Sequence, residues 1–178
     1  NGKSYNIYDD GLKVYTTINT QMQEYAEEGM AQHMTMLQKS IDTRLDMKTG
    51  SIWKKHENIL EKAVKESDRW KNGEEDGLSD KEIRASFDVK VQMKVFAWNS
   101  RREKDTVMTP MDSIKYHLQM EQASFMAMDP VTGEVRAWVG GINFKTYKND
   151  HVNLKTKRQV GSTIKPFLYT QAMEERGF

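Results

Sequence analysis

The chain has 178 residues, a formal net charge of +1 and no cysteine. This length is enough for one domain, or for one small domain and part of another. A charge this close to zero gives no strong attraction to nucleic acid or to an anionic membrane, and the lack of cysteine excludes disulfides and thiolate metal sites. No apolar run approaches the ~18–20 residues needed to cross a bilayer, and the first residues lack a signal-peptide pattern.

The first part of the chain is predicted to be mainly helical. A run of β-branched and aromatic residues predicts a strand over residues 12–18. Thr20 and Gln23 have the spacing of a capping box, and apolar residues at helical intervals then predict a helix to about residue 38. A second helix is expected over residues 52–70.

Further local signals follow in the middle of the chain. Residues 72–76 (Asn-Gly-Glu-Glu-Asp) predict an acidic, turn-rich loop. Ser79 and Glu82 form a second capping-box spacing, which opens a short helix that ends near Phe87. Alternating apolar residues over 89–97 predict a strand with one wetter face.

The next segment combines a loop and a helix start. Residues 101–105 are strongly charged and are predicted to form a loop. Thr109 is a good N-cap, and Pro110 suits the first position of a helix that should run to about Glu121.

A β-hairpin is predicted after this helix. Residues 123–128 and 134–139 read as strands, and the turn chemistry of residues 129–133 (Asp-Pro-Val-Thr-Gly) joins them. A long polar loop is expected over residues 140–157. The overall fold class is therefore predicted to be α+β.

The candidate for chemistry is a serine and a lysine near the end of the chain. Ser162 and Lys165 lie three residues apart at the start of a predicted helix over residues 162–176, with Gly161 as the turn into it and Gly177 as its C-terminal cap. Residues at i and i+3 share one helix face, so the amine can reach the hydroxyl. A serine becomes a nucleophile when a neighbouring base takes its proton, and a lysine serves as that base only with a depressed pKa. The arrangement suits acyl transfer through a serine ester.

The spacing alone has an ordinary alternative explanation. Ser51 and Lys54 have the same spacing within a highly charged stretch, and we give them no catalytic meaning. A serine in such a pair is more often a helix cap beside a solvated lysine. Context must decide for Ser162.

That context resembles a known family. Residues 128–141 (Met-Asp-Pro-Val-Thr-Gly-Glu-Val-Arg-Ala-Trp-Val-Gly-Gly) and 158–167 (Arg-Gln-Val-Gly-Ser-Thr-Ile-Lys-Pro-Phe) closely resemble the opening of the transpeptidase domain of class A penicillin-binding proteins. Residues 10–18 and 108–114 are also similar to that family. The resemblance is strongest over residues 122–178.

The resemblance implies a fold, a division of the chain and a chemistry. Residues 1–120 would be a mainly helical linker or pedestal, and residues 121–178 the first β-hairpin and central helix of an incomplete transpeptidase domain with a serine β-lactamase-like fold. Ser162 would be the nucleophile acylated by D-alanyl-D-alanine stem peptides and by penicillins, and Lys165 would be its base. The family needs no metal or organic cofactor for this reaction.

One departure from the family pattern is large. The family completes its site with a Ser-x-Asn and a Lys-Thr-Gly motif downstream, and neither follows Lys165 here. Residues 155–157 (Lys-Thr-Lys) are no substitute, because they lack the glycine and precede the serine. The chain is thus expected to be a truncated half-site that is inactive alone. It is also expected either to be only marginally stable or to hide the apolar face of the Ser162 helix by self-association.

The resemblance also implies a location. Such proteins carry a membrane anchor and a glycosyltransferase domain, which would lie upstream of Asn1. The protein would then act in the bacterial cell envelope, on the periplasmic side of the inner membrane. Its partners would be peptidoglycan stem peptides and, as covalent inhibitors, β-lactams, with no nucleic acid.

Other functions remain as alternatives. The chain could belong to a D,D-carboxypeptidase or a β-lactam sensor, or to a non-enzymatic envelope scaffold in which Ser162 only caps a helix. Metal binding has little support, because the four histidines are scattered without a ligand pattern. The basic loop before the helix is either a solvated surface or an attractor for a substrate carboxylate. Its positively charged residues are Lys145, Lys148, Lys155, Lys157 and Arg158.

Overall fold

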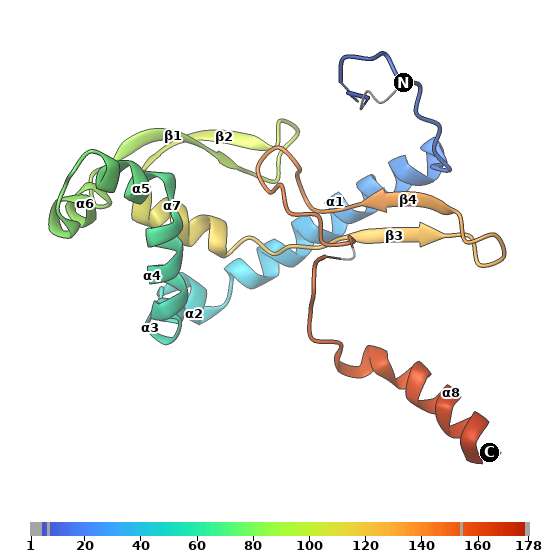
Figure 1. Cartoon of the computed structure of the whole chain (residues 1–178). Helices are drawn as coiled ribbons and strands as arrows, with labels where there is room; N and C mark the ends of the chain where they lie inside the picture. Colours follow the sequence, from blue (N-terminus) through green and yellow to red (C-terminus); the bar gives the residue numbers. More distant parts are fainter. Residues whose placement is uncertain (1–4, 7, 154, 177–178) are drawn as a thin grey trace.

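A computed structural model describes residues 5–6, 8–153 and 155–176 (Figure 1). Helices and short antiparallel strands alternate along the chain, which agrees with the predicted α+β class. The α-helices are α1 (Thr20–Asp42), α2 (Leu45–Lys48), α3 (Ile52–Lys55), α4 (Glu57–Glu66), α5 (Asp68–Glu75), α6 (Asp80–Ser86), α7 (Pro110–Leu118) and α8 (Lys165–Arg176). The strands are β1 (Val91–Phe96), β2 (Glu103–Met108), β3 (Phe125–Met128) and β4 (Val135–Val139), and a 3-10 turn, η1 (Gly161–Ile164), precedes α8.

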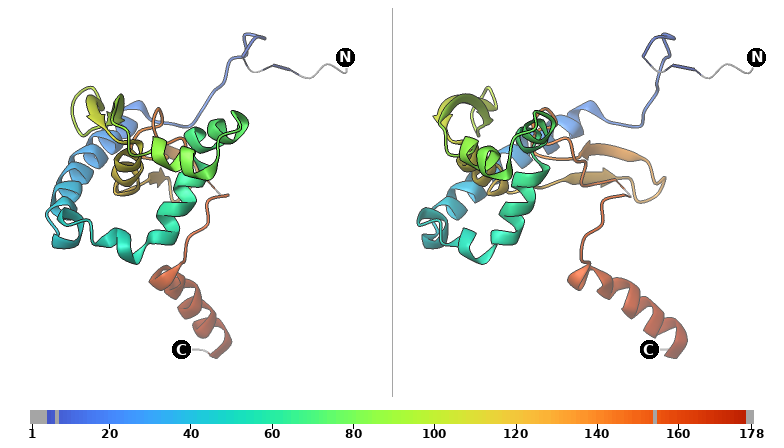
Figure 2. Two further views of the ribbon diagram at one scale, coloured as in Figure 1. Left: turned by 90° about the vertical axis from the view of Figure 1, so that its left-hand side faces the viewer. Right: turned by 60° about the vertical axis from the view of Figure 1, so that its left-hand side comes forward.

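The long helix α1 lies between two β-hairpins. Among the described residues, β1 pairs with β2 and β3 pairs with β4, each pair antiparallel and forming a sheet of its own. Figure 1 shows β1 and β2 on the same side as α4 to α7, whereas β4 of the other hairpin lies against the first half of α1. Helix α8 projects away from the rest of the chain in both views of Figure 2.

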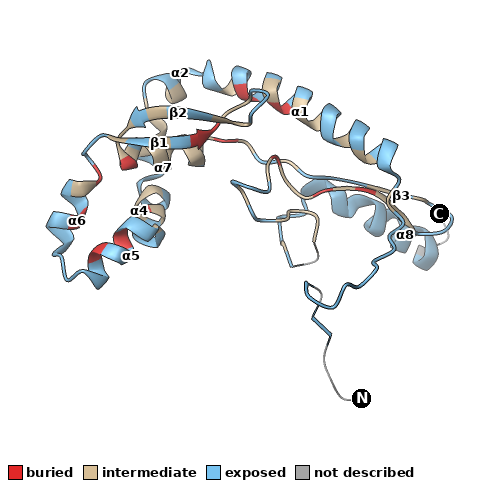
Figure 3. Cartoon of the chain, turned by 90° about the horizontal axis from the view of Figure 1, so that it is seen from above, coloured by how far each residue is buried: buried red, intermediate tan, exposed pale blue. Residues whose placement is uncertain are grey.

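Two small hydrophobic clusters hold the described residues together, and Figure 3 shows their most buried parts in red. The first cluster joins α1 to the end of β1 and to the segments that flank β3 and β4, and its buried members are Met34, Phe96, Met120 and Ile142. The second joins α4, α5, α6 and the residue that follows α6, and its buried members are Val64, Trp70, Ile83 and Phe87. Apolar burial of this kind is the main stabilising contribution to folding.

Several predicted elements are confirmed. The capping box is present, because Ser79 accepts a hydrogen bond from the Glu82 backbone while the Glu82 carboxylate accepts one from the Ser79 N–H. Thr109 caps α7 by accepting from the Asp112 N–H, and Pro110 occupies the first turn. The predicted strands over 89–97, 123–128 and 134–139 are found as β1, β3 and β4, each shorter by a few residues.

The predicted strand over residues 12–18 is wrong. The structure has no strand there, and Val14 and Tyr15 are largely exposed, so the apolar residues of this segment have no core to pack on. The end of the segment touches β4 only locally, where Thr17 Oγ1 donates to Val135 O (2.6 Å) and Asn19 N donates to Arg136 O (2.9 Å).

The predicted capping box at Thr20 is also wrong. The cap of α1 is the preceding residue, Asn19, whose side chain accepts from the Met22 N–H (3.0 Å). Gln23 does not fold back on the cap, because its amide bonds both the N–H (2.7 Å) and the C=O (3.0 Å) of Trp138 in β4. A tertiary contact has replaced the local one, and the helix runs beyond the expected end at residue 38.

The single helix predicted over residues 52–70 is divided into α3, α4 and the start of α5. The chain leaves helical geometry at His56 and again at Ser67, which restarts the helix by accepting from the Trp70 N–H. The predicted loop over residues 72–76 is consequently mostly helix. Gly73 is buried there, because Ile83 packs directly against its backbone.

The predicted charged loop over residues 101–105 is partly strand. Glu103 begins β2 and pairs with Phe96, and the following residues continue the ladder. The charged side chains of Lys104 and Asp105 are exposed, and Lys94 lies 3.5 Å from the Glu103 carboxylate. No residue of β2 is fully buried, which explains why charged residues are compatible with a strand here.

Candidate active site

The serine and the lysine lie where a tight turn meets the start of α8. Gly161 has a φ of +52°, a left-handed conformation that glycine adopts readily, so the predicted glycine turn is present. Ser162 lies in η1, and the Lys165 N–H donates to the Ser162 carbonyl. The predicted helix over 162–176 is thus a 3-10 turn followed by α8, and the predicted cap at Gly177 lies outside the described residues.

Both side chains face solvent. Ser162 and Lys165 are exposed, and no hydrogen bond joins Ser162 Oγ to Lys165 Nζ within the described part of the chain. The two residues lie three positions apart on the turn that leads into α8, and residues at this spacing share one face of a helix. Their roles as nucleophile and base stay predictions.

Helix α8 carries an uncovered apolar surface. Phe167 is 72% exposed, and neighbouring apolar side chains on the helix are also exposed. Figure 1 shows the helix without another element packed along it. The apolar residues of α8 and of the turn before it that are exposed are Val160, Ile164, Phe167, Leu168, Tyr169 and Met173.

The loop between β4 and η1 is organised around one carboxylate. Asp150 Oδ2 accepts from the Trp138 indole N–H (2.9 Å), and Oδ1 accepts from the Val152 N–H (2.8 Å). The Asp150 carbonyl accepts from the Thr156 hydroxyl (2.6 Å), which binds the following turn to the same residue. These contacts tie the polar loop back to the end of β4.

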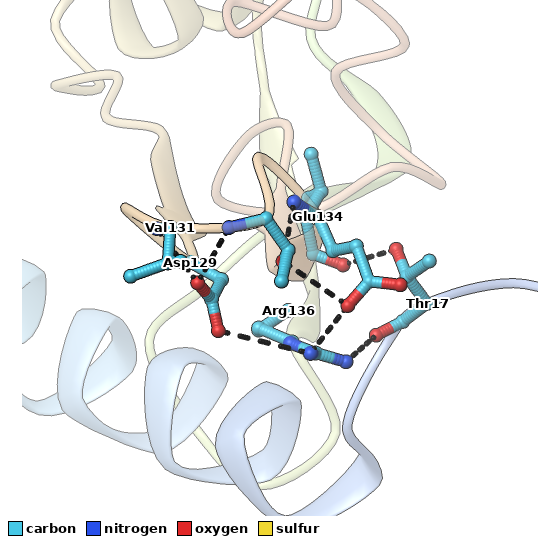
Figure 4. Close-up of polar contacts among 7 residues, drawn as sticks. Thr17, Asp129, Val131, Glu134 and Arg136 are labelled. Carbon is cyan, nitrogen blue, oxygen red and sulfur yellow. Dashed lines mark hydrogen bonds and ion pairs between the residues drawn. The ribbon is translucent and has the colours of Figure 1, made fainter.

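The turn between β3 and β4 is a compact polar network (Figure 4). Asp129 Oδ1 accepts from the N–H groups of Val131 (2.9 Å) and Thr132 (3.0 Å), and these bonds, with the nearby Arg136 guanidinium, lower the pKa of the Asp129 carboxyl. Arg136 also pairs with Glu134 (2.5 Å) and donates to the carbonyl of Thr17 (3.4 Å). The predicted turn over residues 129–133 is confirmed, and the Asp129 carboxylate caps it.

The basic loop residues are mostly surface groups. Lys145 forms an ion pair with Glu103 (3.0 Å) on β2, and this contact lowers the pKa of the Glu103 carboxyl. Arg158 Nη2 lies 3.3 Å from His151 Nδ1, which agrees with an anchoring role for the arginine.

The histidines are not brought together. His117 Nδ1 bonds the Tyr147 hydroxyl (2.9 Å), and burial lowers the pKa of the His117 ring and raises that of the Tyr147 hydroxyl. Within the described residues, no group of three or more His, Asp or Glu side chains is placed to hold a metal ion.

Sequence reasoning missed one concave site. The aromatic residues Trp98, Trp138, Phe144 and Tyr147 line a cavity beside α1. Trp98 is far from the other three in the sequence but close to them in the fold. The only hint in the sequence was the density of aromatic residues in the polar loop, which gave no indication that Trp98 would join them.

Comparison with known proteins agrees with the family resemblance. Residues 48–120 match the model of the penicillin-binding protein middle domain. Penicillin-binding protein 1A of Pseudomonas aeruginosa is 27% identical over 199 aligned residues, which cover 94% of this chain and 24% of that protein. These matches support a fragment of a class A penicillin-binding protein.

Shorter and more similar matches support the assignment to the class A penicillin-binding proteins. Penicillin-binding protein 1A of Vibrio cholerae is 46% identical over 52 residues, which cover 29% of this chain and 6% of that protein. Penicillin-binding protein 2D of Bacillus subtilis is 45% identical over 53 residues, which cover 30% of this chain and 8% of that protein. The chain spans about a quarter of the length of the Pseudomonas relative.

No solved structure matches the chain. Among the described residues, none of the helices combines the length and the apolar character that crossing a membrane requires.

Proposed function

We propose that the protein containing this chain is a peptidoglycan D,D-transpeptidase with Ser162 as its acyl-accepting nucleophile. The observation that carries the proposal is the placement of Ser162 and Lys165, both exposed, at the start of a helix directly after the left-handed Gly161. This placement accompanies a family match and the transpeptidase-like motifs that surround it in the sequence.

The chemistry follows from the two side chains. Ser162 Oγ attacks the carbonyl of the penultimate D-alanine of a stem peptide while Lys165 Nζ accepts its proton. The bond to the terminal D-alanine breaks, the leaving amine takes a proton, and an ester on Ser162 remains. An amine from a neighbouring strand then takes the acyl group and restores the serine hydroxyl. The start of α8 adds a positive electrostatic field that favours the developing oxyanion.

The proposal also assigns the two parts of the chain to different domains. Residues 1–120 form the linker or pedestal, and residues 121–178 contribute the beginning of the transpeptidase domain. The matched middle-domain segment ends at residue 120, which supports this boundary. We place the protein in the bacterial cell envelope, outside the cytoplasm and anchored to the membrane, because its relatives are penicillin-binding proteins.

The test is covalent labelling of the complete gene product. The protein is incubated with benzylpenicillin, and the intact mass and the labelled peptide are read by mass spectrometry. We expect one penicilloyl group on the peptide that contains Ser162, and none in Ser162→Ala. Ser51→Ala is the matched control, because Ser51 has the same spacing to Lys54 and should leave labelling unchanged.

The outcome separates the alternatives. A folded protein that acquires no label would refute the acyl-serine mechanism and favour an envelope scaffold in which Ser162 is only part of a helix start. If the label forms, a stem-peptide substrate with and without an added amine acceptor distinguishes transfer from simple hydrolysis, which would instead indicate a D,D-carboxypeptidase.

A further inference from the structure

A cavity of about 420 Å³ lies where three distant segments of the chain meet. Its walls come from the middle of α1, from the connection between β1 and β2, and from the loop after β4. Tyr147 in that loop packs edge to face on Phe96 at the end of β1, with ring centroids 5.6 Å apart. The volume falls in the range of roughly 300–1,000 Å³ that is usual for small-molecule sites. Neither Ser162 nor Lys165 lines the cavity.

The aromatic walls are held in place by hydrogen bonds behind them. The Trp138 indole donates to Asp150 (2.9 Å), and the Tyr147 hydroxyl bonds His117 Nδ1 (2.9 Å). Phe144, by contrast, is 77% exposed. The site thus combines preorganised rings with an accessible one, and a flat apolar surface of a ligand can pack on such rings.

The charged groups in the wall already have partners. Glu27 Oε1 accepts from the Gln23 amide (2.7 Å), and both carboxylate oxygens of Asp150 accept hydrogen bonds. The Arg102 guanidinium lies over the ring of Trp98, 5.1 Å from its centroid. Because carboxylates and a guanidinium are both present, the lining does not select for an anion or for a cation. The chemistry favours a neutral ligand.

Two features of the wall suggest that it is adapted to a ligand. Arg102 has a φ of +56°, the one left-handed conformation outside glycine among the described residues, and strained backbone of this kind is concentrated at functional sites. The indole N–H of Trp98 is buried without a hydrogen-bond partner in the described part of the structure. A ligand oxygen that reached it after a small rotation of the ring would recover that bond.

We propose that this cavity binds a pyranose ring of a neutral oligosaccharide. A sugar ring has a C–H face that packs on an aromatic ring and a rim of hydroxyls that both donate and accept hydrogen bonds. Asn143 and Asn149 also line the cavity. Asn143 Oδ1 already accepts from the Thr146 N–H (2.9 Å), which leaves the amide hydrogens of Asn143 as donors, and the Asn149 side-chain oxygen is an acceptor for such a rim. This binding does not depend on the Ser162 chemistry, so either proposal can fail without the other.

The chain's four tryptophans provide the test. The ¹⁵N-labelled chain is titrated with chitotetraose, a neutral β-1,4-linked oligosaccharide, and the four indole N–H signals are followed by NMR. Trp98 and Trp138 line the cavity, whereas Trp53 and Trp70 do not and act as internal controls. We expect saturable shifts of the first two signals only. No saturable shift, or equal shifts of all four signals, would overturn the proposal.

A pair of phenylalanine variants sharpens the result. Phe144→Ala should weaken binding by about tenfold, because it removes an exposed stacking surface without touching a buried core. Phe125→Ala is the control, since Phe125 on β3 is also exposed and does not line the cavity. Unchanged affinity in Phe144→Ala, with its indole spectrum otherwise intact, would also contradict the assignment.

Discussion

Trp138 donates its indole N–H to the carboxylate of Asp150 over 2.9 Å, across the turn that leaves β4. The same carboxylate lies against Gly140, where a Cβ atom would stand 2.7 Å from Oδ1. A charged acceptor therefore joins the hairpin to the loop that leads toward Ser162, and a glycine makes the close approach possible. This link adds to the packing of Ile142 and Tyr147, which also ties the loop after β4 to the rest of the chain.

We expect Asp150→Asn to destabilise the protein by about 1–2 kcal/mol, because an amide retains one acceptor oxygen where two are needed. Urea unfolding followed by tryptophan fluorescence measures the change. Asp105→Asn is the control, since Asp105 is exposed on β2 and should tolerate the change. Equal stability of the two variants would show that the Trp138–Asp150 bond does not hold the loop.

Two helical glycines should respond in opposite ways to alanine. At Gly73 a Cβ atom would lie 2.8 Å from the buried side chain of Ile83, so Gly73→Ala should cost ~1–3 kcal/mol through overpacking. At Gly29 in α1 no atom lies within 4 Å of the added Cβ, so Gly29→Ala should stabilise by up to ~1 kcal/mol. Thermal unfolding of both variants checks the contrast, and a destabilised Gly29→Ala would contradict it.

Local signals in the sequence predicted the elements that local contacts determine. The capping residues Ser79 and Thr109 and the turn at Asp129 depend on atoms within a few residues, and all three were recognised. The errors lie where a distant segment intervenes. Gln23 bonds β4 instead of its own cap, and Gly73 stays helical because Ile83 packs on it.

The placement of the two candidate residues at the start of a helix could be predicted for a different reason. Ser162 and Lys165 are close in sequence, so their spacing alone placed them on one turn, and Gly161 has the expected left-handed backbone. The aromatic cavity could not be predicted in the same way. Trp98 and Trp138 are far apart in the chain, and only the pairing of the loop with the β1–β2 hairpin brings them to one wall.

Helix capping can be tested with two serines that each stand directly before a short helix. Ser79→Ala should cost about 1 kcal/mol, because it removes the acceptor for the Glu82 N–H at the start of α6. Ser51→Ala should have little effect, because Ser51 precedes α3 without capping it through its side chain. Urea unfolding of each variant gives the comparison, and equal losses would mean that the capping box contributes nothing specific.

Stability should fall on mild acidification because of His117. Burial lowers the pKa of this ring below its usual 6.5, so the unfolded chain binds the proton more readily than the folded one. The stabilisation from the neutral ring is fully present above pH 6.5 and declines as the pH falls from there toward the lower pKa of the folded state. His117→Gln should flatten this part of the pH profile of the unfolding free energy. His33→Gln, on an exposed position of α1, should leave it unchanged, and the reverse pattern would assign the effect elsewhere.

The uncovered surface of α8 should make this chain self-associate. Phe167 is 72% exposed and Met173 is 59% exposed, and side chains of this kind leave water when a second apolar surface is available. We expect the apparent mass in light scattering to rise with protein concentration. Phe167→Asp should shift the chain toward the monomer, whereas Val131→Asp, at the even more exposed tip of the β3–β4 turn, should not. A chain that stays monomeric at high concentration and melts in one sharp transition would show that α8 needs no cover.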